Sequence, residues 1–205
     1  AFTEVRYLAH AKQMQALELI PQLAAEFQQQ FGRDSGGLIR QYRMEDADTV
    51  VIALGSVLGT IKDTIDDLRD EGNKIGVLGI TSFRPFPLTE IRDAVSHVRR
   101  VVVVEKCFAV GIGGIVSRDV RSAMRNRPQP LYCVVAGLGG RAITKDSLHQ
   151  LFMEAIEDKL EPLTFLDLDW NAVNRELERE RLTRRSGPIA ENLLRDLGVV
   201  AARVG

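Results

Sequence analysis

Short apolar runs alternate along this chain with longer amphipathic segments. Four runs are rich in valine and isoleucine: Thr49–Gly55, Lys74–Ile80, Arg100–Glu105 and Leu131–Gly137. Apolar runs of this length are typical of strands that are buried on both faces of a sheet. The segments between them have the apolar spacing of helices. Strands and helices therefore alternate, and the pattern predicts an α/β fold with a mainly parallel sheet.

The same pattern predicts a helical arm before the α/β domain. Residues 1–37 have helical spacing, and Pro21 is expected to break or kink this helix, or to begin a second one. The α/β domain is expected to cover residues 38–159, and Leu38–Arg43 could add an edge strand before the first strong one.

Residues 160–205 have a different character, with many alternating charges that predict a helical tail. A break is expected at residues 186–188, and one last short helix around residues 189–197. We interpret the tail as a solvated face with local ion pairs. The alternative is a segment that lies along a partner subunit, with Trp170 as its apolar anchor.

Composition narrows the class of function. The chain has 27 basic and 28 acidic side chains among 205 residues, without the basic excess of a nucleic-acid-binding protein. No apolar run approaches the roughly 20 residues that span a bilayer. Ala1–His10 also lacks the pattern of a secretory signal. Cys107 and Cys133 fit no metal-ligand spacing and no disulfide framework. We therefore expect a cytoplasmic protein with neither nucleic acid nor membrane as partner.

Two glycine clusters follow strands and could bind an anion through backbone N–H groups. One is Gly111–Gly114, before a helix, and the other is Gly137–Arg141, where a guanidinium is added. Neither has the G-x-G-x-x-G spacing of a dinucleotide site, so close backbone packing or contact with another chain is the preferred interpretation. Arg84, between Phe83 and Pro85, is interpreted as an interface arginine that could also bind an anion. The full set of candidate anion-binding or interface residues is Ser56, Arg84, Gly111, Gly113, Gly114, Gly137, Gly139, Gly140 and Arg141.

Groups that could move protons are few. Glu105 ends a predicted strand, but a single carboxylate without a partner is weak evidence for catalysis. His10, His97 and His149 all lie on predicted helices, away from the strand ends where a base is expected. Spacings for zinc ligands, iron–sulfur clusters and a nucleophile elbow are missing. We therefore expect no catalytic residue, no metal and no cofactor on this chain alone.

Several motifs occur together in one collinear order. They are Tyr42–Asp48 followed by Val50–Ser56, then Phe83–Pro87, Gly111–Gly114 and Ala136–Thr144, with a helix ending at Phe27–Arg33 and an opening segment Phe2–Tyr7. Over residues 1–159 this set resembles the carboxyl-terminal region of the alpha subunit of pyruvate:ferredoxin oxidoreductases. That region is core domain II, which resembles the carboxyl-terminal domain of transketolase. The departures from the family pattern are Lys106–Val110, the residue Ala142 and the long tail.

The resemblance implies a three-layer α/β/α domain with a mostly parallel five-stranded sheet, in which Leu38–Arg43 is the antiparallel edge strand. It also implies a non-catalytic assembly role in an enzyme that oxidatively decarboxylates pyruvate to acetyl-CoA and reduces ferredoxin. Thiamine diphosphate, magnesium and iron–sulfur clusters would then be bound elsewhere in the complex. Expected partners are the other subunits, ferredoxin and coenzyme A through the complex, and a second copy in a homodimeric assembly.

Two other functions stay open. One is the equivalent domain of another thiamine enzyme, of the transketolase or 2-oxoacid dehydrogenase type. The other is an anion-binding regulatory scaffold, with the glycine clusters as its binding loops.

Overall fold

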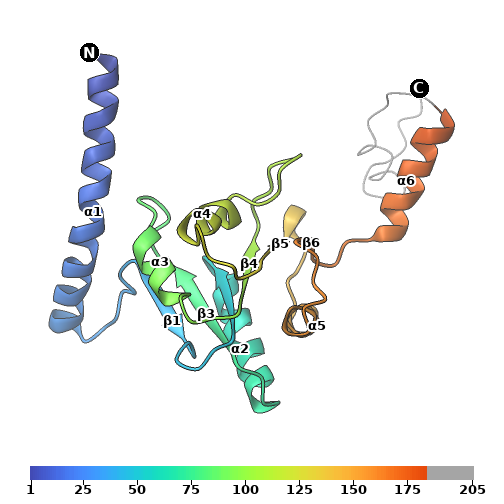
Figure 1. Ribbon diagram of the computed structural model, residues 1–205, viewed down its shortest axis with the longest axis horizontal. Helices are drawn as coiled ribbons and strands as arrows, with labels where there is room; N and C mark the ends of the chain where they lie inside the picture. The colour runs from blue at the N-terminus through green and yellow to red at the C-terminus, as the bar shows by residue number, and fades with distance from the viewer. Residues whose placement is uncertain (184–205) are drawn as a thin grey trace. The chain divides into compact units, whose positions relative to one another are not determined.

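A computed structural model describes residues 1–183 (Figure 1). In chain order the elements are α1 (Phe2–Phe31), β1 (Ile39–Tyr42), β2 (Thr49–Ala53), α2 (Val57–Asp70), β3 (Ile75–Ile80), α3 (Leu88–Ala94), β4 (Arg100–Glu105), α4 (Val116–Ala123), β5 (Leu131–Val135), the 3₁₀ turn η1 (Leu138–Gly140), α5 (Lys145–Ile156), β6 (Leu163–Phe165) and α6 (Trp170–Thr183). The four strong apolar runs are all strands, as the sequence predicts. The short helix expected around residues 189–197 lies outside the described residues.

The strands form one sheet in the order β1-β3-β2-β4-β5-β6. Every neighbouring pair is parallel except β1 with β3, which confirms the antiparallel edge strand. The expected number of strands, five, is wrong. The sheet has a sixth strand, β6, in the section that the sequence pattern assigned to the tail. This strand is only three residues long, half-exposed and without the apolar run that marks the other strands, so no pattern signals it.

Helices cover both faces of the sheet, which confirms the three-layer architecture (Figure 1). Alternate residues of a strand point to opposite faces. Val51 and Ala53 accordingly pack with α2 and α5 in one core cluster. Val50 and Ile52 pack with α3 and α4 in the other cluster. Phe152 of α5 is the largest fully buried side chain.

The connections around β2 create a crevice at the carboxyl end of the sheet. The chain moves outward from β2 to β3, then crosses back to β4 on the other side of β2. The loops that follow β2 and β4 therefore leave neighbouring strands toward helices on opposite faces. In doubly wound sheets such a switch point is where ligands bind.

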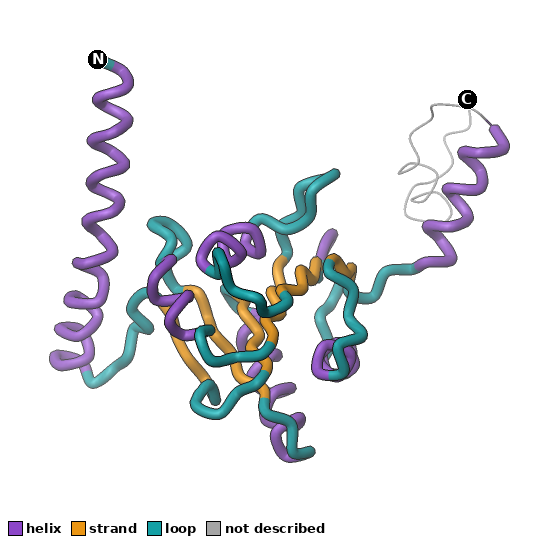
Figure 2. The backbone as a smooth tube through the Cα atoms, in the orientation of Figure 1, coloured by secondary structure: helices purple, strands orange, loops and turns teal. Residues whose placement is uncertain are grey.

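A narrow loop extends away from the sheet between β4 and α4 (Figure 2). We call residues 106–114 the β4–α4 loop. Ala109 and Gly113 form an isolated antiparallel bridge across it, and the amides of Ile112 and Gly113 both donate to the Ala109 carbonyl. Val110 and Ile112 at its tip are 89% and 65% exposed.

Helix α1 is continuous through Pro21, so the expected break into two helices is wrong. A proline inside a helix removes one backbone hydrogen bond and strains the turn before it. No residue of α1 is buried, so water can reach the carbonyl group that loses its partner. The helix thus continues through Pro21 although a proline in a helix interior costs about 3 kcal/mol.

The chain divides into two units, and the second begins at Asp167. Within the described part of this unit, Glu176 of α6 is buried and accepts a 2.6 Å hydrogen bond from Arg179. Trp170 is 62% exposed. The predicted division of the chain at residues 37 and 159 stays a prediction, but Leu160 packs in the core of the domain, and β6 lies beyond that second boundary.

Candidate functional site

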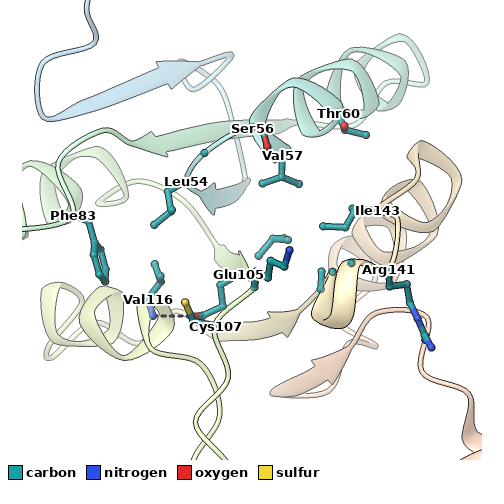
Figure 3. Close-up of a pocket in the computed structure, with 16 residues that line it drawn as sticks. Leu54, Ser56, Val57, Thr60, Phe83, Glu105, Cys107, Val116, Arg141 and Ile143 are labelled. Carbon is teal, nitrogen blue, oxygen red and sulfur yellow. Dashed lines mark hydrogen bonds between the residues drawn. The ribbon is translucent and has the colours of Figure 1, made fainter. Parts of the chain in front are cut away.

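A cavity of about 610 Å³ lies at the switch point, at the carboxyl ends of the central strands (Figure 3). Loops after β2, β3, β4 and β5 all contribute to its lining. We call it the switch-point cavity, and its lining residues are Leu54, Gly55, Ser56, Val57, Thr60, Phe83, Val104, Glu105, Lys106, Cys107, Val116, Ala136, Gly137, Gly140, Arg141 and Ile143. Most of its accessible lining is apolar, which is typical of pockets for small organic ligands.

Among residues 1–183, Glu105 is the only carboxylate in the lining, and both of its oxygens are already bonded. Its Oε2 accepts hydrogen bonds from the backbone N–H groups of Ile115 and Val116, both at 2.8 Å, and its Oε1 accepts one from Ser117 at 2.9 Å. The side chain is 6% exposed. The carboxylate thus acts as an internal cap on the amino terminus of α4, where unbonded N–H groups and the helix dipole favour a negative charge.

This cap gives the start of α4 an internal anion, which agrees with the preferred interpretation that Gly111–Gly114 serves close backbone packing. The N–H groups that would hold the anion belong to the start of α4 and already donate to Glu105. Gly114 is required there, because a Cβ atom at this position would overlap the Glu105 carboxylate and the Ser117 hydroxyl. The expectation that Glu105 has no partner is wrong for the same reason. Its partners are backbone amides ten to twelve residues later, which no side-chain motif signals.

The second glycine cluster forms a tight turn. Gly137, Gly139 and Gly140 have φ values of 76°, 63° and 82°, a region that favours glycine. In Figure 3 the Arg141 side chain extends away from the apolar side chains of the cavity. Thr144 then caps α5, since its side-chain oxygen accepts from the Ser147 amide at 3.1 Å.

The helix that follows β2 has no side-chain cap at its start, unlike the helix that follows β4. Ser56 precedes α2, but its side chain makes no capping hydrogen bond. The first turn of α2 contains no acidic residue. Gly55 has a φ of 81°, and a Cβ atom there would meet nothing within 4 Å. The amino terminus of α2 is therefore open toward the cavity and is not neutralised by a side chain.

Arg84 lies outside the lining of the cavity. Its guanidinium is 4.1 Å from the Phe83 ring centroid and 5.9 Å from that of Phe86, so it is flanked by two aromatic rings. It also forms a 2.8 Å ion pair with Asp119 of α4. The Arg84 charge, which could have bound an external anion, is therefore paired within the chain, and its role at an interface stays a prediction.

The remaining reactive groups do not form a catalytic arrangement. Cys107 is exposed at the cavity, and Cys133 is buried with its Sγ atom 3.8 Å from the Glu105 carboxylate. In the part of the chain that the structure describes, no histidine lines the cavity. His149 bonds to Glu71 at 2.9 Å, and His97 bonds to the Met44 carbonyl at 3.0 Å.

A charged side chain with several hydrogen-bond partners, Arg100, lies at the opposite, amino-terminal end of the strands. The Arg100 side chain is 7% exposed. Its Nε and Nη2 atoms donate to the two Asp158 carboxylate oxygens at 2.9 and 2.8 Å. This ion pair lowers the pKa of the Asp158 carboxyl. Burial, together with the Asp158 charge, raises the pKa of the nearby Tyr132 hydroxyl. These pKa changes arise in a structural ion pair and indicate no catalytic group.

A magnesium–diphosphate group does not fit the residues of the cavity. Such a group needs free oxygen ligands for the metal, and both oxygens of Glu105 are already bonded. Among residues 1–183 there is also no cluster of three or more histidine, cysteine, aspartate or glutamate side chains placed to hold a metal ion. In that part of the chain, no helix is both long and apolar enough to cross a bilayer.

Comparison with known proteins decides the family. Residues 47–148 match the family described as pyruvate:ferredoxin oxidoreductase core domain II. This chain belongs to that family. A pyruvate synthase subunit PorA of Methanosarcina barkeri is 40% identical over 156 residues, which are 75% of this chain and 39% of the relative. A ketoisovalerate oxidoreductase subunit VorA of Pyrococcus horikoshii is 35% identical over 146 residues, which are 70% of this chain and 37% of that relative.

A solved structure is also similar. It is a 2-oxoglutarate:ferredoxin oxidoreductase from Magnetococcus marinus, with a TM-score of 0.47 and 18% identity, and the match covers 66% of this chain and 21% of that one. The core domain II chain described here spans less than half the length of these relatives. The resemblance inferred from the collinear motifs is thus confirmed at the level of the family.

The motifs indicated the correct family but not the cavity. Of the nine candidate residues, the cavity brings together Ser56, Gly137, Gly140 and Arg141, whereas Arg84, Gly111, Gly113, Gly114 and Gly139 lie outside its lining. The motifs missed Lys106 and Phe83 as lining residues. The signal that could have found them is their position directly after strands, at the edge where loops of a parallel sheet meet.

Proposed function

We propose that this chain is a non-catalytic assembly domain of a thiamine-diphosphate-dependent 2-oxoacid:ferredoxin oxidoreductase. The enzyme would convert pyruvate and coenzyme A to acetyl-CoA and reduce ferredoxin in the cytoplasm. Thiamine diphosphate, magnesium and the iron–sulfur clusters would be bound by other parts of the complex. The match to core domain II and to pyruvate synthase subunits supports this assignment.

The single observation that supports a non-catalytic role is the state of Glu105. It is the only acidic side chain at the switch-point cavity, and its oxygens accept three backbone hydrogen bonds. A catalytic acid or base must be free to reach the proton that it transfers. With Glu105 bonded inside the fold and no histidine among the described residues of the lining, the cavity offers no free carboxylate or imidazole for proton transfer.

The β4–α4 loop supports a role in assembly. Its tip exposes Val110 and Ile112, and a backbone bridge between Ala109 and Gly113 holds its shape. Rigid exposed apolar side chains at the end of a projecting loop are suited to insertion into an apolar pocket of another chain, because little conformational entropy is lost. We assign this loop as a contact to another subunit of the oxidoreductase.

Reconstitution tests the proposal. The chain alone should show no pyruvate-dependent reduction of ferredoxin, and activity should appear when the remaining subunits are added. Turnover by the purified chain alone would overturn the non-catalytic role. Activity of the other subunits at full rate without this chain would overturn the role in assembly.

A double variant, Val110→Asp with Ile112→Asp, tests the loop contact. Both side chains are exposed, so the variant should fold with an unchanged free energy of unfolding. Association with the other subunits should weaken by about 2–4 kcal/mol, because two apolar groups no longer become buried. Arg125→Asp, an exposed charge change just beyond α4, is the matched control. Normal assembly of the double variant would refute the contact.

The VorA relative supports a second candidate substrate, 2-ketoisovalerate. The two candidates share the reaction class and differ only in the side chain of the 2-oxoacid. Competition between pyruvate and 2-ketoisovalerate in the reconstituted enzyme, measured as the ratio of kcat/KM values, decides between them. A higher value for 2-ketoisovalerate would replace pyruvate in the proposal and leave the assembly role intact.

A further inference from the structure

We propose that the switch-point cavity is a binding site for a compact organic anion, with an aromatic or branched aliphatic body and a single phosphate or carboxylate group. The proposal goes beyond the assembly role and does not depend on it. The cavity would hold the anionic group at the start of α2 and the apolar body between the side chains that follow β2, β3 and β4.

Size and lining favour a small organic molecule. The volume of about 610 Å³ falls in the range of roughly 300–1,000 Å³ that is usual for such sites. Leu54, Phe83 and Val116 lie together on one side of the cavity, and Ile143 lies on the opposite side (Figure 3). Leu54 is 39% exposed although it directly follows a fully buried strand. An apolar body between these walls would remove that exposed surface from water.

The charges around the cavity favour an anion. Lys106 lines it, and among the described residues of the lining the only acidic group is Glu105. Because the Glu105 carboxylate is bonded to the start of α4, its charge is compensated there. Lys106 thus has no acidic neighbour with unbonded oxygens in the lining. An ammonium group beside an apolar pocket is suited to pair with a carboxylate or phosphate.

The start of α2 also lines the cavity and supplies backbone N–H donors there. Helices α4 and α5 each have a side-chain oxygen bonded to their first amides, from Glu105 and Thr144 respectively. At α2, the Ser56 side chain makes no such bond, and no acidic residue lies in the first turn. Figure 3 shows Ser56 and Val57 at the edge of the cavity. The 14-residue helix therefore directs a positive dipole end and a serine hydroxyl toward the same space as Lys106.

Titration of the ¹⁵N-labelled 205-residue chain tests the proposal. Phenyl phosphate and benzoate are the two anionic probes, and benzyl alcohol is the uncharged probe of similar size. One of the two anions should produce saturable amide shifts at Gly55, Ser56 and Val57, and the better of the two identifies the anionic group. Absence of saturation for both anions at up to about 10 mM would overturn the site. Equal binding of benzyl alcohol would overturn its preference for an anion.

Two variants separate binding from folding. Lys106→Gln should weaken binding about fivefold or more, whereas Lys74→Gln, an exposed lysine at the other end of the strands, should leave it unchanged. Ser56→Asp places a negative charge at the start of α2, which favours the helix but repels the ligand. This variant should bind at least tenfold more weakly while its melting temperature stays the same or rises. Unchanged binding by both Lys106→Gln and Ser56→Asp would overturn the proposal.

Discussion

The internal cap on α4 makes a quantitative prediction about Glu105. The substitution Glu105→Gln keeps the size of the side chain, removes its charge and replaces one acceptor oxygen with an NH₂ group. In the structure this carboxylate accepts three hydrogen bonds of 2.8, 2.8 and 2.9 Å and is 6% exposed. At least one amide of α4 would lose its acceptor, and the NH₂ group would face an N–H donor.

The expected loss follows from these contacts. A hydrogen bond to a charged group contributes about 1.5–3 kcal/mol, and an unsatisfied buried donor costs about 1–3 kcal/mol. Because the three bonds share one side chain, their contributions are not additive. We therefore expect Glu105→Gln to lower the free energy of unfolding by about 2–3 kcal/mol. Glu105→Ala, which also leaves a cavity, should lower it by about 3–5 kcal/mol.

Urea unfolding followed by circular dichroism measures this loss. With a slope of about 2 kcal/mol per molar urea, the midpoint of Glu105→Gln should fall by about 1–1.5 M. Glu161→Gln, at an exposed glutamate of the same domain, should change the free energy by less than about 0.5 kcal/mol. A similarly small change in Glu105→Gln would refute the reasoning, because the start of α4 would then not depend on the carboxylate.

Three further predictions follow from single contacts. Gly114→Ala should destabilise the domain by about 2–4 kcal/mol in the same urea assay, because its new Cβ atom would displace the Glu105 carboxylate. Phe152→Ala should cost about 3–5 kcal/mol, measured by thermal unfolding, because its side chain is fully buried. Arg100 holds the pKa of the Asp158 carboxyl below its ordinary value of 3.8, so this pair stabilises the fold above that pH and the stabilisation is lost as the pH falls. The difference in unfolding free energy between the natural chain and Asp158→Asn should therefore shrink between about pH 6 and pH 3, and a constant difference would contradict this.

The α/β core could be predicted from the sequence because its strands are buried on both faces. The run Arg100–Glu105, with four consecutive valines, is typical of such strands. Strand β6 has no such signal, because it is three residues long and lies at the edge of the sheet. Pro21 misled the prediction because the rule for proline describes a local cost of about 3 kcal/mol, and α1 continues over 30 residues in spite of it.

The site was harder to predict because it depends on contacts between distant residues. The glycines of Gly111–Gly114 indicated a helix start that favours negative charge, which is correct. The anion that satisfies it is Glu105 of the same chain, and only the folded structure brings the two together. Likewise, the switch-point cavity combines residues from four loops, and each loop alone has an ordinary composition.

The bond between Glu105 and the start of α4 also has a consequence for evolution and engineering. It ties together the two ends of the β4–α4 loop, so the sequence between these ends can change without loosening the sheet beneath it. The exposed tip could then be replaced as a cassette that alters which chain is recognised, while the domain keeps its stability. Exchanging residues 107–112 between core domain II proteins would make use of this hydrogen-bonded connection at the base of the loop.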